Sequence, residues 1–180
     1  CIHLPTYACV SLLHATQLCN GADALLVDSD STSFNVLDAG RAPWIEVFVH
    51  TYGAIRENMP EAIEDCTHAI GAPGIGAMGA VSVCSLGPTK LLRTFAGGMI
   101  LAPRAIAEEI RERRDYDSKE RSWLQRFNWQ MPDVNAAVAL VSLARLNDDI
   151  AWRLATMARY NQEHGFAVHP TATAYRYVAS

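Results

Sequence analysis

The sequence is poor in lysine: it has two, Lys90 and Lys119, against thirteen arginines among 180 residues. It also lacks an excess of charge of either sign, because its formal net charge is −4. A basic surface for nucleic acid is therefore not expected. No apolar run approaches the roughly 18 residues that a membrane span needs. These absences predict a globular chain that binds neither nucleic acid nor a membrane.

Five cysteines are present, but none forms a Cys-x-x-Cys pair. This spacing argues against a zinc site and against a disulfide framework, so we expect no metal and a reducing cytoplasm. The chain opens on Cys1 without a signal-peptide pattern. It also lacks repeats and Gly/Ser linkers. We expect one domain over residues 1–165, with residues 166–180 as the start of a second, shortened one.

Short apolar runs alternate with turns and helical stretches, which is typical of an α/β protein. Because the runs are apolar almost throughout, they predict strands buried on both faces of a sheet. The expected strands lie within residues 1–5, 24–30, 45–53, 62–66, 80–86 and 97–103. The expected helices cover residues 10–21, 104–114 and 132–164. The last begins at Pro132 and Asp133 and stops at Gly165.

The stretch GIGAMG, residues 74–79, matches the dinucleotide-binding spacing GxGxxG. That fingerprint needs a strand before it and a helix after it, so that the pyrophosphate meets the N-terminus of the helix. Here a valine-rich stretch follows, which predicts a strand. We therefore interpret residues 74–79 as a turn between two strands and not as a nicotinamide or flavin site.

Asp65 lies at the end of one expected strand and Lys90 follows the next one along the chain, at the edge where ligands of open α/β sheets bind. The amine of a lysine can lose its proton and attack a carbonyl, whereas an arginine side chain stays charged. A lysine beside a carboxylate suits a cofactor that has one electrophilic carbon and one basic ring nitrogen. Pyridoxal phosphate fits that description.

Six segments, in their order along the chain, resemble the DegT/DnrJ/EryC1/StrS family of pyridoxal-phosphate-dependent sugar aminotransferases. They are VDSDSTSFNV, VFVHTYG, IEDCTHAIGA, SLGPTK, AGGMIL and FNWQMPDVNAAVALVSLARLND. The resemblance covers about residues 1–165. It implies the large domain of the type I fold of pyridoxal-phosphate-dependent transferases, a three-layer α/β/α sandwich with a mostly parallel sheet.

The resemblance implies a role for five residues, each of which would otherwise be an ordinary surface, turn or structural residue. Lys90 matches the lysine that forms the Schiff base with the cofactor, and Asp65 matches the carboxylate that pairs with the pyridine nitrogen. His68 matches the residue beside the phenolic oxygen of the cofactor ring. Ser85 matches a ligand of the phosphate, and Asn128 matches an asparagine that reaches the cofactor of the neighbouring subunit. A shared site implies a homodimer.

The sequence also departs from the family pattern. Family members carry a phosphate-binding Gly-Thr or Gly-Ser turn ahead of the segment that matches Ile2. They place an aromatic ring on the cofactor at the position that we align with Cys9, and Tyr7 substitutes for it only in a shifted register. The intervals 34–50 and 53–65 are shorter than usual, which predicts a trimmed crossover. Because the segment that matches the Gly-Thr or Gly-Ser turn is not in this sequence, we expect the N-terminal part of the phosphate site to be missing.

Two functions of different classes follow. In the first, the protein is an aminotransferase that moves an amino group from an amino acid, with glutamate as the expected donor, to a keto group on a nucleotide-linked sugar. In the second, it is a shortened and catalytically impaired member that holds cofactor or supports an intact homologue. A dehydratase of the same fold is a third interpretation, but relatives of that kind replace the lysine with histidine, and Lys90 favours transamination. Arg93 is a weaker candidate for contact with a phosphate or carboxylate. The tryptophans are expected in core or dimer packing, and they are Trp123, Trp129 and Trp152.

Overall fold

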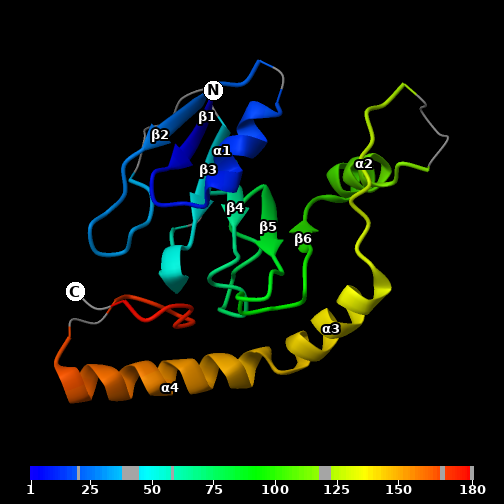
Figure 1. Cartoon of the computed structure of the whole chain (residues 1–180). Helices are drawn as coiled ribbons and strands as arrows, with labels where there is room; N and C mark the ends of the chain where they lie inside the picture. The colour runs from blue at the N-terminus through cyan, green and yellow to red at the C-terminus, as the bar shows by residue number, and fades with distance from the viewer. Residues whose placement is uncertain (20, 38–44, 58, 118–122, 167–168, 179–180) are drawn as a thin grey trace.

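The structure, a computed structural model, describes residues 1–19, 21–37, 45–57, 59–117, 123–166 and 169–178 (Figure 1). Its six-stranded sheet has the order β2-β1-β3-β4-β5-β6. Neighbouring strands pair in parallel, except that β5 and β6 are antiparallel. The strands are β1 (Ile2–Pro5), β2 (Ala24–Val27), β3 (Ile45–Val49), β4 (Ile63–Asp65), β5 (Val81–Ser85) and β6 (Gly98–Leu101). The predicted mostly parallel α/β sheet is confirmed.

The helices of the described residues follow the sequence signals closely, and they are α1 (Val10–Gln17), α2 (Arg104–Arg114), α3 (Asp133–Ala144) and α4 (Leu146–His164). α3 begins directly after Pro132, and α4 ends at Gly165, whose φ of 67° is the left-handed conformation that glycine adopts easily. The predicted run over 132–164 is divided at Arg145. α1 is shorter than predicted and ends at Gln17.

The connection from β3 to β4 is compact. In its described residues it contains a short 3-10 turn, η1 (Thr51–Gly53), and otherwise turns and irregular backbone. Gly53 has a φ of 90°, and a Cβ atom there would collide with the hydroxyl groups of Thr171 and Thr173. The turn therefore lets the C-terminal segment approach the end of β3 directly.

Burial on both faces of the sheet, as predicted, holds for the inner strand β3 but not for the edges. Val47, Phe48 and Val49 are buried, whereas Leu25 and Leu26 in β2 are 50% and 56% exposed. The prediction is wrong for β2 because this strand is the outermost of the sheet. An apolar run marks a strand, but it does not show whether another layer covers both of its sides.

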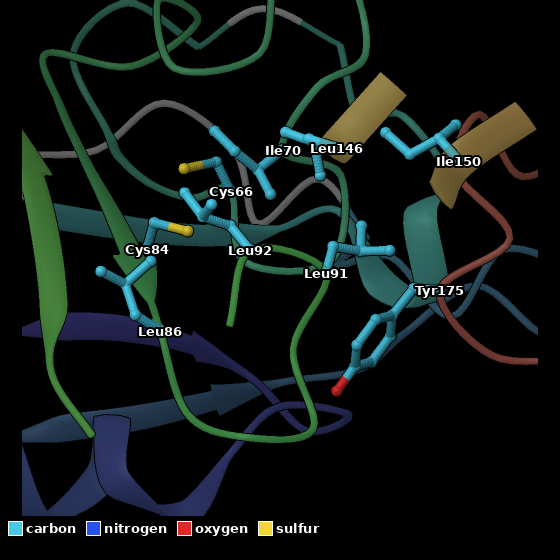
Figure 2. Packing of buried hydrophobic residues seen from close by; sticks show 9 residues of the cluster. All are labelled: Cys66, Ile70, Cys84, Leu86, Leu91, Leu92, Leu146, Ile150 and Tyr175. Atoms are coloured by element: carbon cyan, nitrogen blue, oxygen red, sulfur yellow. The ribbon is translucent and has the colours of Figure 1, made fainter. Parts of the chain in front are cut away.

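The main hydrophobic core lies at the carboxyl ends of β4 and β5. Figure 1 shows these ends directed towards α4 and the C-terminal segment, residues 169–178. The side chains of this core come from β5, from the turns after β4 and β5, from the first half of α4 and from the C-terminal segment (Figure 2). They are Cys66, Ile70, Cys84, Leu86, Leu91, Leu92, Leu146, Ile150 and Tyr175. This packing fixes the edge of the sheet at which Asp65 and Lys90 were predicted.

The three tryptophans expected in core or dimer packing are not in the core. Trp123, Trp129 and Trp152 are 78%, 64% and 68% exposed. Trp129 stacks on Phe127 at 4.0 Å between ring centroids, within the segment that joins α2 to α3. Only Trp152 lies in a helix, α4, whereas Trp123 and Trp129 lie in the segment between α2 and α3. The core interpretation is therefore wrong, and the dimer interpretation stays a prediction.

Candidate active site

Asp65 is the last residue of β4. The backbone N–H of Cys66 still donates to Val83 O in β5, at 2.9 Å, and the chain then turns away. The backbone N–H of Thr67 donates to Asp65 Oδ1 at 3.0 Å, which holds the carboxylate at the strand end. Asp65 is therefore positioned by the sheet and by the first residues of the turn, as its place in the sequence predicted.

Lys90 follows β5 on a turn that is closed by a hydrogen bond from its backbone N–H to Gly87 O, at 3.0 Å. Its Nζ atom lies 5.5 Å from the centroid of the Tyr175 ring, over the ring face. Hydrogen bonds with Ser11 lower the pKa of the Cys9 thiol. The charge of Lys90 lowers this pKa further and the charge of Asp65 raises it, so Cys9 lies within the influence of both site residues. The lysine, the carboxylate and Cys9 thus share one edge of the sheet.

His68 is neutral in this site. Burial, and then the charges of Lys90 and Arg176, lower the pKa of its ring to about 4. Its Nδ1 atom accepts a hydrogen bond from the Tyr52 backbone N–H at 3.2 Å, so the ring proton resides on Nε2. The ring also stacks on Tyr175 at 4.0 Å between centroids. The sequence placed a histidine here, but only the structure shows that it can act as a neutral hydrogen-bond donor.

Ser85 ends β5 and is exposed. Its hydroxyl accepts a weak hydrogen bond from Gly87 N–H at 3.4 Å, and its own backbone N–H donates to Thr67 Oγ1 at 2.9 Å. The structure therefore brings Ser85 to the same edge as Asp65, His68 and Lys90. An exposed hydroxyl beside a glycine-containing turn is accessible to an anion.

Asn128 does not join these four residues. It is exposed, on the segment that runs from α2 to α3 away from the sheet (Figure 1). The backbone on either side is bound to the end of α2, through hydrogen bonds from Phe127 N–H to Arg113 O and from Trp129 N–H to Arg114 O. Within one chain, this arrangement of the elements keeps Asn128 out of contact with the edge of the sheet that bears Lys90.

Aromatic residues that the sequence interpretation missed line the same edge. Phe34 and Tyr52 have φ values of 58° and 51°, which is unusual for large side chains. Their rings meet edge to face at 5.9 Å, and Tyr52 in turn lies parallel to His68 at 5.9 Å. Tyr175 completes the group from the C-terminal segment. The available sequence signal was Tyr52-Gly53, an aromatic residue and a glycine at the end of the predicted strand 45–53.

The backbone N–H groups of the glycine stretch 74–79 bind a carboxylate, and this carboxylate is a side chain of the protein itself, that of Glu64. The Glu64 carboxylate, fully buried, accepts hydrogen bonds from the backbone N–H groups of Gly76 at 2.9 Å and Met78 at 3.0 Å. It also accepts from Ser82 Oγ at 2.6 Å and from His50 Nε2 at 3.0 Å. Burial raises the pKa of Glu64, but these hydrogen bonds outweigh it and hold the pKa below its ordinary value. A strand follows the loop, as its interpretation as a turn predicted.

Arg93 does not point freely into the site. Its Nη2 atom pairs with Asp149 Oδ2 at 2.9 Å, and its backbone N–H donates to Ser142 Oγ at 3.0 Å. These contacts attach the turn after Lys90 to α3 and α4. The residue is a link between elements, so the interpretation of Arg93 as a substrate contact has no support.

Two further observations concern metals and membranes. Within the ranges that the structure describes, no three histidine, cysteine or acidic side chains gather as a metal ion would need. The helices of those same ranges include none with the length and apolar character to cross a membrane. The five cysteines are free.

Solved structures share this architecture. A DegT DnrJ EryC1 StrS aminotransferase from Brucella abortus superposes with a TM-score of 0.79 and 22% identity, over 96% of this chain and 57% of that one. DesV of S. venezuelae, solved in complex with a ketimine intermediate, gives 0.78 and 22%, over 95% of this chain and 53% of that one. NtdA from Bacillus subtilis, with bound cofactor PMP, gives 0.76 and 19%, over 91% and 43%. The fold is thus the large domain of the type I pyridoxal-phosphate-dependent transferases, as predicted.

Within that class, the chain belongs to the DegT/DnrJ/EryC1/StrS aminotransferase family, whose model matches residues 48–173. Among curated proteins it is similar to GDP-perosamine synthase of Caulobacter vibrioides, with 28% identity over 185 aligned positions. That alignment covers 89% of this chain and 50% of the relative. The chain therefore spans about half the length of the curated relative that it matches. The predicted family is confirmed. Members of this family use pyridoxal phosphate.

Proposed function

We propose that this chain is the cofactor-binding domain of an aminotransferase that moves an amino group from an amino acid to a keto group on a nucleotide-linked sugar. We expect glutamate as the donor. Family membership supports the class of reaction. The relatives support the class of acceptor, because one is a GDP-perosamine synthase and another, DesI, was solved with its TDP-sugar product.

The observation that carries the proposal is the placement of Asp65 at the carboxyl end of β4 and of Lys90 on the turn after β5, with neutral His68 on the turn after β4 and under the influence of the Lys90 charge. The set suits pyridoxal phosphate. In the described part of the chain, the Lys90 ammonium contacts the Tyr175 ring and pairs with no carboxylate. His68 has a proton on Nε2 to donate, because Nδ1 is already an acceptor. Carboxylate, imidazole, hydroxyl and amine are the donors and acceptors that this cofactor requires.

Bound pyridoxal phosphate supplies an aldehyde that condenses with amines and a pyridine ring that accepts electrons. Asp65 would hold a proton on the ring nitrogen, and His68 Nε2 would donate a hydrogen bond to the phenolic oxygen. Ser85 would bind the phosphate. Lys90 would bind the aldehyde carbon and, once displaced by the amino donor, would move the proton as general base and acid.

We further propose that residues 1–165 form the cofactor-binding domain and that residues 166–180 begin the next. Asn128 would serve the cofactor of a second copy, which makes the functional unit a homodimer. Its exposed position on a segment that leaves the sheet supports this assignment.

The alternative function, an impaired member that holds cofactor or supports a homologue, is favoured by one observation. Cys9 lies within the influence of the Lys90 and Asp65 charges, at the position aligned with the family's stacking aromatic ring. Tyr7 instead packs on Phe34, with 4.8 Å between ring centroids. A thiol provides less contact with a cofactor ring than an aromatic side chain.

Borohydride trapping separates the two functions. The purified protein is mixed with pyridoxal phosphate and reduced, and peptide mass spectrometry identifies the labelled lysine. The aminotransferase proposal requires label on Lys90 but not on Lys119, loss of that label in Asp65→Ala, and conversion of the bound cofactor to its amine form by an amino acid donor. Label without conversion supports the impaired member. Equal label on the two lysines refutes a built site.

A further inference from the structure

Thr67 lies between two of the proposed cofactor ligands, Asp65 and His68, and is 4% exposed. Its backbone N–H donates to Asp65 Oδ1 at 3.0 Å. Its hydroxyl oxygen accepts from the Ser85 backbone N–H at 2.9 Å. One buried residue thus makes direct contact with both strand ends of the site, the end of β4 through its backbone and the end of β5 through its side chain.

The hydroxyl contact replaces backbone pairing at the point where that pairing stops. The β4–β5 ladder ends with Asp65 opposite Val83, and the last backbone bond from the β4 side is Cys66 N–H to Val83 O. Beyond it the chain after β4 turns away, and the next amide of β5 that faces it belongs to Ser85. Thr67 Oγ1 accepts from that amide, so the end of β5 stays attached to the turn.

We propose that Thr67 is a positioning residue whose hydroxyl holds Ser85 in register with Asp65 and His68. The inference rests on the proposed function, because it concerns the ligands of the cofactor. Valine has nearly the shape of threonine but cannot accept a hydrogen bond, so it leaves the Ser85 N–H without its partner in a partly buried contact. The end of β5 must then shift towards solvent, and Ser85 moves relative to Asp65.

The test compares Thr67→Val and Thr67→Ser in the full 180-residue chain. Pyridoxal phosphate affinity, measured by absorbance titration, should fall about tenfold in the valine variant, because one partly buried hydrogen bond is lost. It should change less than about twofold in the serine variant. Amide hydrogen exchange without cofactor gives an independent readout. The Ser85 amide should exchange about tenfold or more faster in the valine variant, because its acceptor is gone.

Thr94→Val is the matched control. Thr94 is also 4% exposed, and its hydroxyl makes its hydrogen bonds within its own turn, to Ala96. This variant should keep wild-type affinity and the wild-type exchange rate at Ser85. If Thr67→Val does not fold, Thr67→Ala replaces it with the same expectations.

Wild-type affinity and wild-type Ser85 exchange in Thr67→Val would overturn the inference. Failure of serine to restore both values, or an equal loss in Thr94→Val, would overturn it as well. Failure of the proposed function looks different, because wild-type protein would then neither bind pyridoxal phosphate nor carry label on Lys90. In that case the exchange rate of Ser85 still decides whether Thr67 fixes the strand end.

Discussion

His68 is held by contacts that favour its neutral form. Burial and the nearby cations Lys90 and Arg176 lower its pKa from 6.5 to about 4. We expect its NMR titration, assigned with a His68→Gln variant, to show a neutral ring down to pH values near 4. A midpoint near 6.5 would contradict this site geometry.

The same shift predicts a pH dependence of stability. The folded pKa lies below the unfolded value, so the unfolded chain binds the proton more tightly between about pH 4 and pH 6.5. The contribution of neutral His68 is therefore complete above about pH 6.5 and is lost as the pH falls towards 4. Urea unfolding at several pH values should show a steeper loss in wild type than in His68→Gln.

Cys9 should be the more reactive of the two exposed cysteines that flank α1. Hydrogen bonds with Ser11 and the charge of Lys90 lower its pKa, which raises the thiolate fraction at neutral pH. Iodoacetamide labelling read by mass spectrometry should therefore slow at Cys9, but not at Cys19, in Ser11→Ala. Added pyridoxal phosphate should protect Cys9 and leave Cys19 unchanged. Protection of neither cysteine would place Cys9 outside the cofactor site.

Part of the site could be read at the level of residues, because Asp65 ends one predicted strand and Lys90 lies on the turn after the next, whereas Ser85 and His68 were assigned from the family resemblance. Position along a strand determines the edge at which a side chain appears. Thr67 and Tyr175 could not be found in this way. The first acts through a hydroxyl contact with another strand, and the second is separated by more than a hundred residues from His68, on which it stacks.

Among the elements, the loop 74–79 and strand β4 depend on each other through the Glu64 carboxylate. Glu64→Gln keeps the size of the side chain, but its amide presents N–H groups to at least one backbone N–H donor. We expect a loss of about 3 kcal/mol in the free energy of unfolding, as when one partner of a buried charged network is removed. Urea denaturation measures this loss.

Glu108→Gln is the control for that measurement. Glu108 pairs with Arg104 on α2 at 2.8 Å, but its side chain is 55% exposed. Exposed pairs of this kind contribute about 0.5 kcal/mol or less. Equal losses in the two variants would mean that the carboxylate of Glu64 does not hold the loop.

The elements themselves were largely predictable, for reasons that also explain the exceptions. Each observed strand falls inside a predicted apolar run, and Pro132 and Gly165 mark the ends of the α3–α4 pair. The exposure of Leu25 and Leu26 was not predictable, because the order of strands in the sheet decides which of them lies at an edge. The binding of the Glu64 carboxylate by the glycine loop was not predictable either. The sequence contains no signal that separates a buried glutamate in a strand from one that faces solvent.

At the scale of the whole molecule, the position of Asn128 predicts that two copies share each site. Lys90→Ala and Asn128→Ala chains, each impaired alone, should recover cofactor binding when refolded together. In a mixed dimer one site takes its lysine from one chain and its asparagine from the other. The label should appear on Lys90 of the Asn128→Ala chain, at a higher occupancy than in that chain alone.

Lys90→Ala mixed with Asp65→Ala provides the matched control. Both of these residues lie on the same edge of one chain, so a mixed dimer contains no intact site and should show no recovery. Recovery in both mixtures, or in neither, would argue against an asparagine supplied by the second copy.

The C-terminal segment contacts turns that lie far away in the sequence. His169 Nδ1 lies 3.1 Å from Thr32 O, Ala172 N–H donates to Gly53 O, and Thr173 Oγ1 donates to His68 O. A ribosome releases these residues after all the strands of the sheet. During synthesis the strands can therefore pair before the C-terminal segment covers the edge that bears His68. While residue 173 is still inside the ribosome, the nascent chain should expose this edge to chaperones.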